Sequence, residues 1–546
     1  MAREVSTAET RSRFNTAMLC LFCGVAMAYG WGWRGSYGHK AGAMLPGALV
    51  AMAACLGSAR QDWYRRCAVA GLFGAVGWSV GGSLSNMEHT FYVMSNSLPD
   101  VAFGFACIGL IGALWAGVGG AILSLAFTQP RSELQRFVGP LTAVAVALPL
   151  VFLYAAFNPE QTQAVYRFSQ QHLPPGDWFS PLIVLIVSGI YWLVRPKDRP
   201  AAGLFFLCAA AWWIGFLGLA KYGGLRLAPP NRAETWAGLL GVQAALLYHL
   251  VRQKNRAGVM LTLYAMLAGC IGFILAVFVY VPISAEWGPI PLIAPWKTAE
   301  ETFGLFMGIG VALGIARLRH GGLAASREDK DRAPLDFFAA FVLLIVMMWL
   351  NLYKNVRDWG PYRYDILPEG TMYGLSAPQW FFVIGVLWTM LALYCLVQYR
   401  RRRLMLIPGT TFEKGALLFI VILLVSLVGV AFHRFPDWLI KSNVVFSEAS
   451  YWILGLVTLW LLLARSSEGK QAGPPPTPGV PVDDTRWRVG RRYWLLWVCV
   501  PVLIAVVTAL SLAVVEEGHG RARKRFGPEA YWQQELEKAE MTALAQ

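Results

Sequence analysis

Long apolar segments alternate with short polar connections along the chain from residue 14 to residue 515. Each segment is close to the roughly 20 residues that a helix needs to cross the hydrocarbon core of a bilayer. The segments lie at residues 14–33, 41–59, 67–85, 101–127, 137–157, 179–194, 201–220, 236–251, 257–283, 302–316, 337–353, 380–399, 415–432, 444–464 and 493–515. The pattern predicts an all-α, polytopic membrane protein with about 14–15 transmembrane helices.

The composition favours the same class and argues against a nucleic-acid-binding protein. Hydrophobic residues make up 56% and charged residues 14% of the 546 residues, and the mean hydropathy is +0.48. Soluble domains contain about 45–50% apolar residues. The net charge of +15 would indicate nucleic-acid binding in a soluble chain, but here it fits basic loops beside a membrane. We expect membrane lipids as partners and no nucleic acid.

The basic residues predict the orientation in the membrane. When successive connections are assigned alternately to two sides, most of the 47 Lys and Arg residues fall on the side of the N-terminus. Cytoplasmic loops carry an excess of Lys and Arg, so we expect a protein of the plasma membrane, the inner membrane of a bacterium, with a cytoplasmic N-terminus. With fifteen spans, the basic residues at 521–525 fall on the opposite side. Either this tail is exported or one span is re-entrant, and the sequence leaves both open.

Short sequence matches recur at a separation of just under 200 residues, in the same order along the chain. They pair 46–50 with 237–241, 70–74 with 268–272, 117–119 with 308–310, and 173–176 with 367–370. These matches predict two parallel six-helix repeats followed by a helical extension. The predicted units are 1–200 and 201–400 for the repeats, 401–515 for additional membrane helices, and 516–546 for a basic amphipathic tail. The interface between such repeats is a common substrate site in transporters.

In topology, the six-plus-six layout with an inside N-terminus resembles the major facilitator transporters. That family has a Gly-x-x-x-Asp-Arg-type signature between its second and third spans. The corresponding loop in this chain contains Gly57, Asp62 and Arg65 at a different spacing, and the connection between the halves, at 195–200, is shorter than the family's central loop. The resemblance implies a carrier with a site between its halves, and we infer no membership from it.

A glycine-rich segment between the first two spans is the main candidate for a binding site. Residues 29–42 combine five glycines with tryptophan, tyrosine and cationic side chains. Glycine is roughly 1 kcal/mol less favourable than alanine in a helix, so we expect an irregular loop that lines a cavity. Arginine binds oxyanions through two parallel hydrogen bonds, and aromatic rings stack on flat ligands. An ordinary interfacial loop with aromatic belt residues is the alternative.

The second predicted repeat has an equivalent segment at 221–234, which is again glycine-rich, cationic and aromatic. We expect the two segments to face one cavity and to bind an anionic or polar small molecule. The candidate substrate-binding residues are Trp31, Trp33, Arg34, Tyr37, His39 and Lys40 in the first segment, and Lys221, Tyr222, Arg226 and Arg232 in the second.

Ionisable residues near the ends of spans are candidates for coupling to an ion or a proton. They are Glu88, His89, Glu286, Glu300 and Glu301. Ionisable groups near spans are costly and indicate function, and Glu88 matches Glu286 in the two repeats. These two carboxylates could instead pair with Arg34 and Lys221 or lie in water, and the other two could stabilise a helix start through its dipole. The sequence contains no zinc-ligand spacing and no phosphate loop, so we expect no metal and no cofactor.

Together, these features predict a secondary transporter for a small anionic or polar solute, such as a sugar or a lipid-linked group. One alternative is an integral-membrane enzyme that acts on a lipid-linked phosphate or glycan at the outer face, with His39 or Glu88 as the general base. Another is a non-catalytic membrane scaffold or sensor, in which the tail at 516–546 binds a protein partner. We favour the carrier over the enzyme.

Overall fold

The computed structural model of the chain describes residues 2–37, 39–84, 87–229, 232–285, 294–323, 333–351, 368–401, 411–440, 444–469, 489–519, 522–531 and 533–534. Within these residues the chain is helical, with no named strand and one isolated bridge between Met372 and Leu375. Ten of the described helices are long and apolar enough to cross a membrane. The all-α fold is confirmed, and the ten apolar helices identify an integral membrane protein.

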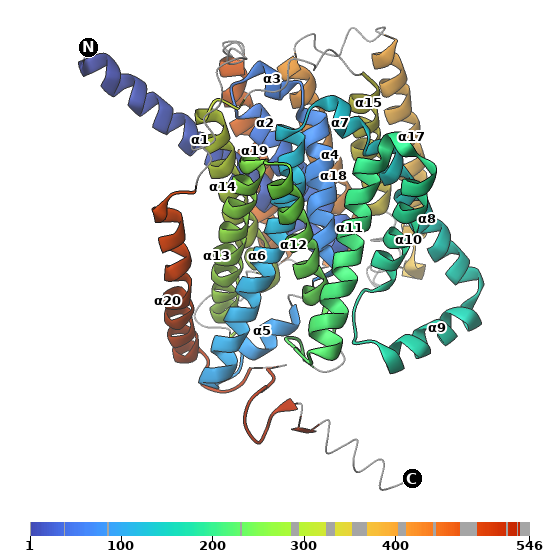
Figure 1. Cartoon of the computed structure of the whole chain (residues 1–546), viewed down its shortest axis with the longest axis vertical. Coiled ribbons are helices and arrows are strands. Elements are labelled where there is room, and N and C mark those ends of the chain that lie inside the picture. Colours follow the sequence, from blue (N-terminus) through green and yellow to red (C-terminus); the bar gives the residue numbers. More distant parts are fainter. Residues whose placement is uncertain are drawn as a thin grey trace.

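The helices follow the chain in the order labelled in Figure 1. They are α1 (Ala2–Tyr37), α2 (His39–Leu56), α3 (Gln61–Tyr64), α4 (Cys67–Val80), α5 (Met87–Val93), α6 (Leu98–Thr128), α7 (Arg131–Gln135), α8 (Val138–Phe157), α9 (Pro159–His172), α10 (Phe179–Val194), α11 (Arg199–Gly215), α12 (Thr235–Arg252), α13 (Arg256–Ser284), α14 (Pro295–His320), α15 (Ala333–Phe341), α17 (Ala377–Arg400), α18 (Thr411–Ile440), α19 (Val444–Gly469) and α20 (Arg491–Val514). Short 3-10 or π-helical turns are η1 (Gly81–Ser83), η2 (Pro196–Asp198), η3 (Phe216–Tyr222), η4 (Val342–Val346) and η5 (Pro368–Gly370). Each of the fifteen predicted apolar segments overlaps one of these helices.

The predicted spans differ in length. Ten of them meet the length and hydropathy expected of a membrane crossing. Four others, at 40–56, 67–80, 179–194 and 449–465, are shorter apolar helices of 10–17 residues. The fifteenth, α12, belongs to neither group, and the exact number of crossings stays a prediction.

Six helices, α1, α2, α4, α6, α13 and α14, form a ring at the centre of the molecule. Each packs against the next in this order, and α14 closes the ring by packing against α1. Gly47 in α2 and Gly74 in α4 face each other so closely that a Cβ on either would overlap the carbonyl oxygen of the other. Gly112 in α6 and Gly269 in α13 meet in the same way. Small residues of this kind bring membrane helices into backbone contact.

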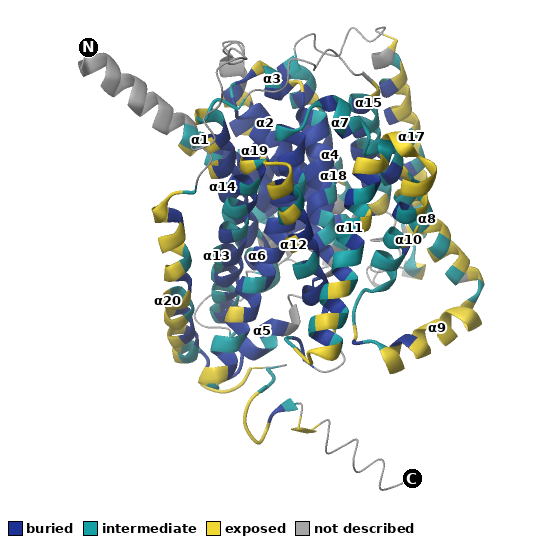
Figure 2. Ribbon diagram, viewed as in Figure 1, coloured by how far each residue is buried: buried dark blue, intermediate teal, exposed yellow. Residues whose placement is uncertain are grey.

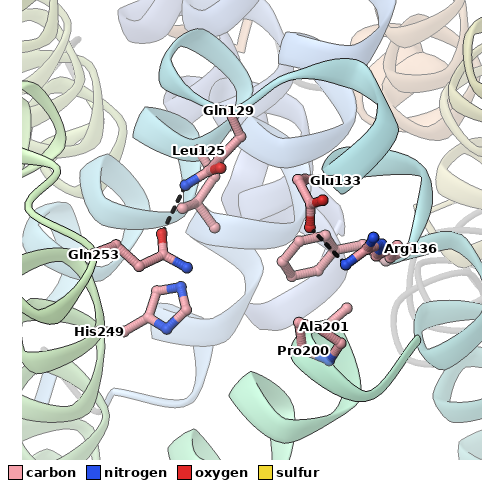
Figure 3. Close-up of a pocket in the computed structure, with 9 residues that line it drawn as sticks. Leu125, Gln129, Glu133, Arg136, Pro200, Ala201, His249 and Gln253 are labelled. Carbon is pink, nitrogen blue, oxygen red and sulfur yellow. Dashed lines mark hydrogen bonds and ion pairs between the residues drawn. The ribbon is translucent and has the colours of Figure 1, made fainter. Parts of the chain in front are cut away.

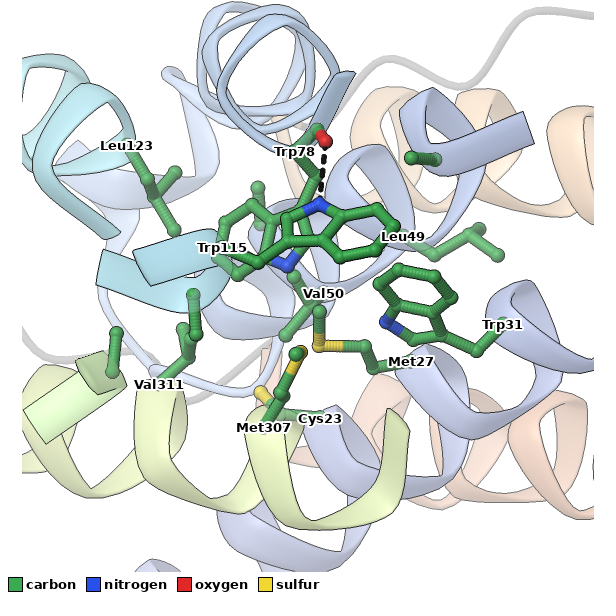
Figure 4. Close-up of a cluster of buried hydrophobic side chains, with 14 of the residues drawn as sticks. Cys23, Met27, Trp31, Leu49, Val50, Trp78, Trp115, Leu123, Met307 and Val311 are labelled. Atoms are coloured by element: carbon green, nitrogen blue, oxygen red, sulfur yellow. Dashed lines mark hydrogen bonds between the residues drawn. The ribbon is translucent and has the colours of Figure 1, made fainter. Parts of the chain in front are cut away.

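Large apolar side chains fill the inside of the ring. Trp31, Trp115 and Met307 are buried, and Figure 4 shows them converging from α1, α6 and α14. The ring centroids of Trp31 and Trp115 are 4.8 Å apart in an edge-to-face arrangement. Trp115 Nε1 donates a 2.8 Å hydrogen bond to the Trp78 carbonyl, which orients the indole. The ring is therefore packed with side chains at this level.

The remaining helices surround the ring. α12 packs against α6 and is followed outward by α11, α10 and α8, while α18, α19 and α20 pack against α2, α1 and α6 respectively. Figure 2 shows buried residues concentrated in the central helices and exposed residues on outer helices such as α8, α17 and α20. The exposed side chains there include Leu150, Leu387 and Val502. Exposed apolar side chains on the outer helices fit contact with lipid.

Helices from both predicted repeats share the central ring. α13 and α14, from 201–400, pack directly against α6 and α1, from 1–200. The centre of the molecule is thus built by both predicted units together. Their relation as parallel repeats stays a prediction.

The two ends of the bundle differ in their polar contacts. At one end, named the basic end, the Arg66 guanidinium donates 2.8 Å hydrogen bonds to the carbonyls of Ala126 and Gln129, where α6 ends. At the same end, Arg131 in α7 and Asp336 in α15 form a 2.7 Å ion pair. These connections all belong to the side that the sequence assigns to the cytoplasm.

At the opposite end, named the tail end, Lys40 at the start of α2 pairs with Asp177. The chain after α20 reaches this end, where the His519 N–H donates to the Met94 carbonyl at 3.2 Å. Figure 1 shows the tail passing the end of the bundle near α5. The tail therefore lies with the connections that the sequence assigns to the outer side. Most of the predicted amphipathic part of the tail falls at 535–546, outside the described residues.

Candidate functional site

The glycine-rich segment is helical, which corrects the expected irregular loop. α1 continues to Tyr37, and α2 begins at His39. The glycines serve close packing instead: a Cβ on Gly30 would overlap the backbone of Pro46 in α2. Contact between the two helices outweighs the low helix propensity of glycine.

Arg34 and Glu300 form a buried ion pair between α1 and α14. Arg34 Nη1 lies 3.2 Å from Glu300 Oε1, and the two residues are 2% and 8% exposed. Both residues were predicted for the site, but the sequence offered Glu88 and Glu286, and not Glu300, as possible partners of Arg34 and Lys221. α14 begins at Pro295, earlier than predicted, so Glu300 lies within the helix and faces α1.

Aromatic rings enclose the Arg34 guanidinium. Its Cζ lies 5.1 Å from the ring centroid of Trp115 and 5.6 Å from that of Trp31. Phe303, one turn after Glu300, packs edge-on against Trp31 at 4.6 Å. Cation–π contacts strengthen to about 2 kcal/mol when water is excluded. Arg34 is therefore a firmly held cation in apolar surroundings, an arrangement that suits the exchange of one oxyanion for another.

The neighbouring residue Glu301 lies beside Gly32 of α1 and also reaches a second helix. Successive residues of an α-helix point roughly 100° apart, so Glu300 reaches α1 while Glu301 reaches α19. Ser450 Oγ donates a 2.7 Å hydrogen bond to Glu301 Oε1. The next residue, Tyr451, stacks on Trp33 with ring centroids 4.0 Å apart. α19 thus completes the site around the predicted residues Trp33 and Glu301.

The other residues of the first segment do not join this cluster or fall outside the described chain. Lys40 pairs with Asp177 and donates a 3.0 Å hydrogen bond to Ser180 Oγ at the start of α10. The side chains of Tyr37 and His39 lie outside the described residues.

Among the predicted coupling residues, the side chain of Glu88 and the whole of Glu286 lie outside the described residues. His89 is buried on α5, and its ring centroid lies 6.5 Å from that of Tyr92. This position groups His89 with the tail-end contacts.

The second predicted segment is divided between a helical turn and a loop. Lys221 and Tyr222 end the π-helical turn η3, and the Lys221 ammonium lies 5.2 Å from the Tyr222 ring centroid. Tyr222 is 77% exposed. Arg226 and Arg232 lie in the loop that precedes α12, and Arg226 lines a cavity next to the tail.

The two predicted segments are connected through residues 173–180. Lys40 binds Asp177 in this connection, and the Glu234 N–H donates a 2.8 Å hydrogen bond to the Pro175 carbonyl. Both segments therefore lie at the tail end. A cavity shared between them stays a prediction.

A small pocket with polar and apolar walls lies at the basic end, between the ends of α6 and α12. Figure 3 shows Gln129 and Gln253 joined by a 2.7 Å hydrogen bond, with His249 beside them. On the other side, Arg136 and Glu133 form a 3.0 Å ion pair. The cavity volume is about 30 Å³, which is the space of about one water molecule. The sequence did not indicate this pocket because its residues come from separate connections.

Sequence reasoning missed Trp115, Tyr451 and Asp177. Trp115 lies in the middle of an apolar span, where a tryptophan carries no polar signal. Asp177 lies in an outer connection opposite a cationic segment, which is a weak signal for its pairing with Lys40. Among the described residues, no group of three or more His, Cys, Asp or Glu side chains is arranged to hold a metal ion.

No protein family model matches the chain, and comparisons with curated proteins and with solved structures give no match. The fold and the site themselves define the class. It is a polytopic α-helical membrane protein whose central six-helix ring contains a buried Arg–Glu pair.

Proposed function

We propose that this protein is a secondary transporter-like carrier of the bacterial inner membrane for a small anionic or polar solute, with Arg34 as the residue that binds the solute. The Arg34–Glu300 pair inside the ring carries this proposal. Arg34 belongs to the predicted first repeat and Glu300 to the second. The pair therefore spans the kind of interface at which repeat-built carriers bind their substrates.

The energetics of a buried pair support a role beyond folding. Removing two charges from water costs several kcal/mol per ion, and the attraction between them often does no better than balance that cost. A solute carboxylate or phosphate offers Arg34 the same oxygen atoms as Glu300. Protonation of Glu300 releases Arg34 for the solute and couples solute movement to a proton. Glu301, the adjacent carboxylate, is the second candidate for coupling.

Access to the pair requires a helix movement. Trp31, Trp115 and Phe303 enclose it in this conformation. α1 and α14 meet along small residues, since a Cβ on Gly308 would overlap the Cys23 carbonyl. Packed helices with smooth surfaces undergo shear motions. We therefore place the opening movement in a displacement of α14 along α1.

Uptake by the full chain in proteoliposomes tests this proposal. The assay measures accumulation of radiolabelled phosphate and of radiolabelled succinate under an inward proton gradient. Arg34→Gln and Glu300→Gln should each abolish accumulation. Arg136→Gln, which breaks a surface ion pair with Glu133, should transport normally.

A double variant separates binding from folding. Arg34→Met combined with Glu300→Met replaces the pair with apolar side chains, so its thermal stability should be close to that of the wild type, while accumulation should be absent. Accumulation that survives in both single variants would show that the pair is structural. Wild-type vesicles that take up neither anion would contradict the anion carrier in favour of the enzyme or scaffold.

A further inference from the structure

The helix α9 lies outside the bundle and is almost entirely exposed. It packs against α8, and Ser169 is the one buried residue among Pro159–His172. Figure 2 shows α9 as an exposed helix beside the bundle. Isolated helices shorter than about 12–15 residues are marginal in water, so a helix with so few protein contacts needs another source of stability.

The apolar side chains of α9 gather on one face. Residues three or four apart are neighbours on a helix, so Val165, Phe168 and His172 form a row, with Ala164 beside it. Gln161 interrupts this face only in the first turn. The charged residues and the other glutamines lie on the opposite face, which contains Glu160, Gln163, Arg167, Gln170 and Gln171. α9 is thus an amphipathic helix.

The described chain leaves the apolar face of α9 uncovered. Val165 and Phe168 are 48% and 60% exposed, and Tyr166 at the border of the face is 63% exposed. The His172 ring stacks on Phe168 with ring centroids 4.2 Å apart, which keeps the two rings together on this face. An uncovered apolar face of this kind indicates contact with a partner or a membrane.

The position of α9 in the chain indicates which of these covers the face. α8 belongs to the candidate membrane span at Arg131–Ala155, and α9 begins at Pro159, directly after it. Leu150 and Leu153 of α8 are exposed, and Phe157 at its end is 77% exposed. Exposed apolar side chains therefore follow one another from the membrane span into α9.

The far end of α9 is held at the tail end of the bundle. Leu173 and Trp178, which follow α9, pack against the hydrophobic core, and Asp177 between them pairs with Lys40 at the start of α2. The next helix, α10, is again apolar. α9 therefore joins two apolar helices at the level where the chain leaves the hydrocarbon, which is the level at which amphipathic helices lie in a membrane.

We propose that α9 lies in the interface of the lipid leaflet at the tail end. Val165 and Phe168 insert toward the acyl chains, and Gln163 on the opposite face lies in water. The polar face carries one negative and one positive side chain, Glu160 and Arg167. Apolar contacts therefore supply the binding, and a neutral lipid is sufficient. This placement is independent of the proposed carrier function.

Accessibility to a membrane-impermeant maleimide tests the proposal in phosphatidylcholine nanodiscs that hold one copy of the full-length protein. Gln163→Cys and Gln170→Cys, on the polar face, should react at the rate of a cysteine in water. Val165→Cys and Phe168→Cys should react at least about tenfold more slowly, because an apolar face inserts about 5–10 Å into the boundary between headgroups and acyl chains. The wild type gives the background of its nine cysteines. Adding phosphatidylglycerol should leave the difference between the faces unchanged.

A charge on the apolar face gives a second test. Phe168→Glu combined with Val165→Cys should raise the labelling rate to that of Gln163→Cys, because an ionised carboxylate is costly among acyl chains. Gln163→Glu combined with Val165→Cys is the matched control. It adds the same charge on the polar face and should leave the labelling rate low.

Equal labelling rates on the two faces in single-copy nanodiscs would overturn the proposal, since α9 would then lie in water. Slow labelling of Val165→Cys that appears only in nanodiscs with two copies would also overturn it, because a second copy of the chain would then cover the face. So would a difference between the faces that requires phosphatidylglycerol, or a labelling rate that Phe168→Glu leaves unchanged.

Discussion

Arg66 shows that a basic residue in a connection can also cap the C-terminal end of another helix. Its side chain is 1% exposed and donates to the carbonyls of Ala126 and Gln129 at the end of α6. The last carbonyls of a helix lack partners within it and carry partial negative charge. Arg66 therefore has two roles. It adds to the excess of Lys and Arg on one side of the membrane, and it donates hydrogen bonds to the last carbonyls of α6.

Arg66→Met should lower the free energy of unfolding by about 2 kcal/mol, because it leaves the buried Ala126 carbonyl and the half-buried Gln129 carbonyl without their charged donor. Arg65→Met is the matched control, since Arg65 carries the same charge on an exposed side chain. Denaturant unfolding in mixed micelles measures both. Equal stability of the two variants would show that water replaces the arginine without cost.

Glu234 closes the loop before α12 as a buried acceptor. Its carboxylate accepts hydrogen bonds from the N–H groups of Leu227 and Ala228, at 3.1 and 3.2 Å, and from Trp236 Nε1 at 2.7 Å. Burial raises the pKa of this carboxyl group above its usual value, and the hydrogen bonds only partly oppose that shift. A raised pKa in the folded state means that ionisation favours the unfolded chain. The contribution of Glu234 to stability therefore decreases as the pH rises from the usual carboxyl pKa through the raised one.

The Tm of the wild type minus the Tm of Glu234→Gln should therefore decrease as the pH rises above about 4, the usual pKa of a carboxyl group. The glutamine variant does not titrate, so it removes every other pH effect that the two proteins share. Differential scanning fluorimetry in detergent gives both values. A difference that increases with pH would mean that the hydrogen bonds lower the pKa of the Glu234 carboxyl group more than burial raises it.

At the scale of single residues, the sequence identified Arg34 and Glu300 but not their pairing. Ionisable groups beside apolar spans are recognisable because they are costly there. The pairing depends on the contact between α1 and α14, which are far apart in the chain and carry no local signal for each other. The stacking of Tyr451 on Trp33 was hidden for the same reason.

At the scale of helices, the length of the apolar segments predicted the positions of the helices well. The glycine content of residues 29–42 led to the wrong prediction of an irregular loop. Each predicted apolar segment overlaps a helix because a chain in lipid must satisfy its backbone internally. Residues 29–37 are helical despite their glycines because α1 packs closely on α2 at Gly30. Propensity is a weak guide where two helices touch through their backbones.

The contact between Gly112 and Gly269 allows a test of whether close backbone contact at glycines stabilises the packing of two helices. Gly269→Ala places a methyl group against the Gly112 carbonyl, so α6 and α13 must separate, at a cost of about 1–3 kcal/mol. Gly218→Ala is the control, because no heavy atom of the described residues lies within 4 Å of a Cβ added there. Thermal unfolding in detergent should show a lower Tm for the first variant and no decrease for the second. Equal Tm values would mean that α6 and α13 are not in backbone contact.

At the scale of the whole molecule, the sequence predicted two sides but not which helices share the centre. Every span is apolar, so hydropathy cannot distinguish the six ring helices from those around them. The alternation of connections did separate the residues that meet at the basic end from those that meet at the tail end. It left the side of the tail at 521–525 open, and the contact of His519 with Met94 agrees with the alternative in which the tail lies opposite the N-terminal side.

The arrangement of the two ends leads to a prediction about orientation. Lys197 is exposed in the connection at the basic end, and Glu517 is exposed where the tail begins. If the excess of Lys and Arg places the basic end in the cytoplasm, a membrane-impermeant maleimide should label Glu517→Cys in intact cells and Lys197→Cys only after permeabilisation. The wild type, whose nine cysteines lie in or beside apolar helices, gives the background. Labelling in the reverse order would mean that the protein has the opposite orientation in the membrane. Equal protection of both cysteines in intact cells would mean that the tail and the basic connections lie on the same side, which would contradict their placement at opposite ends.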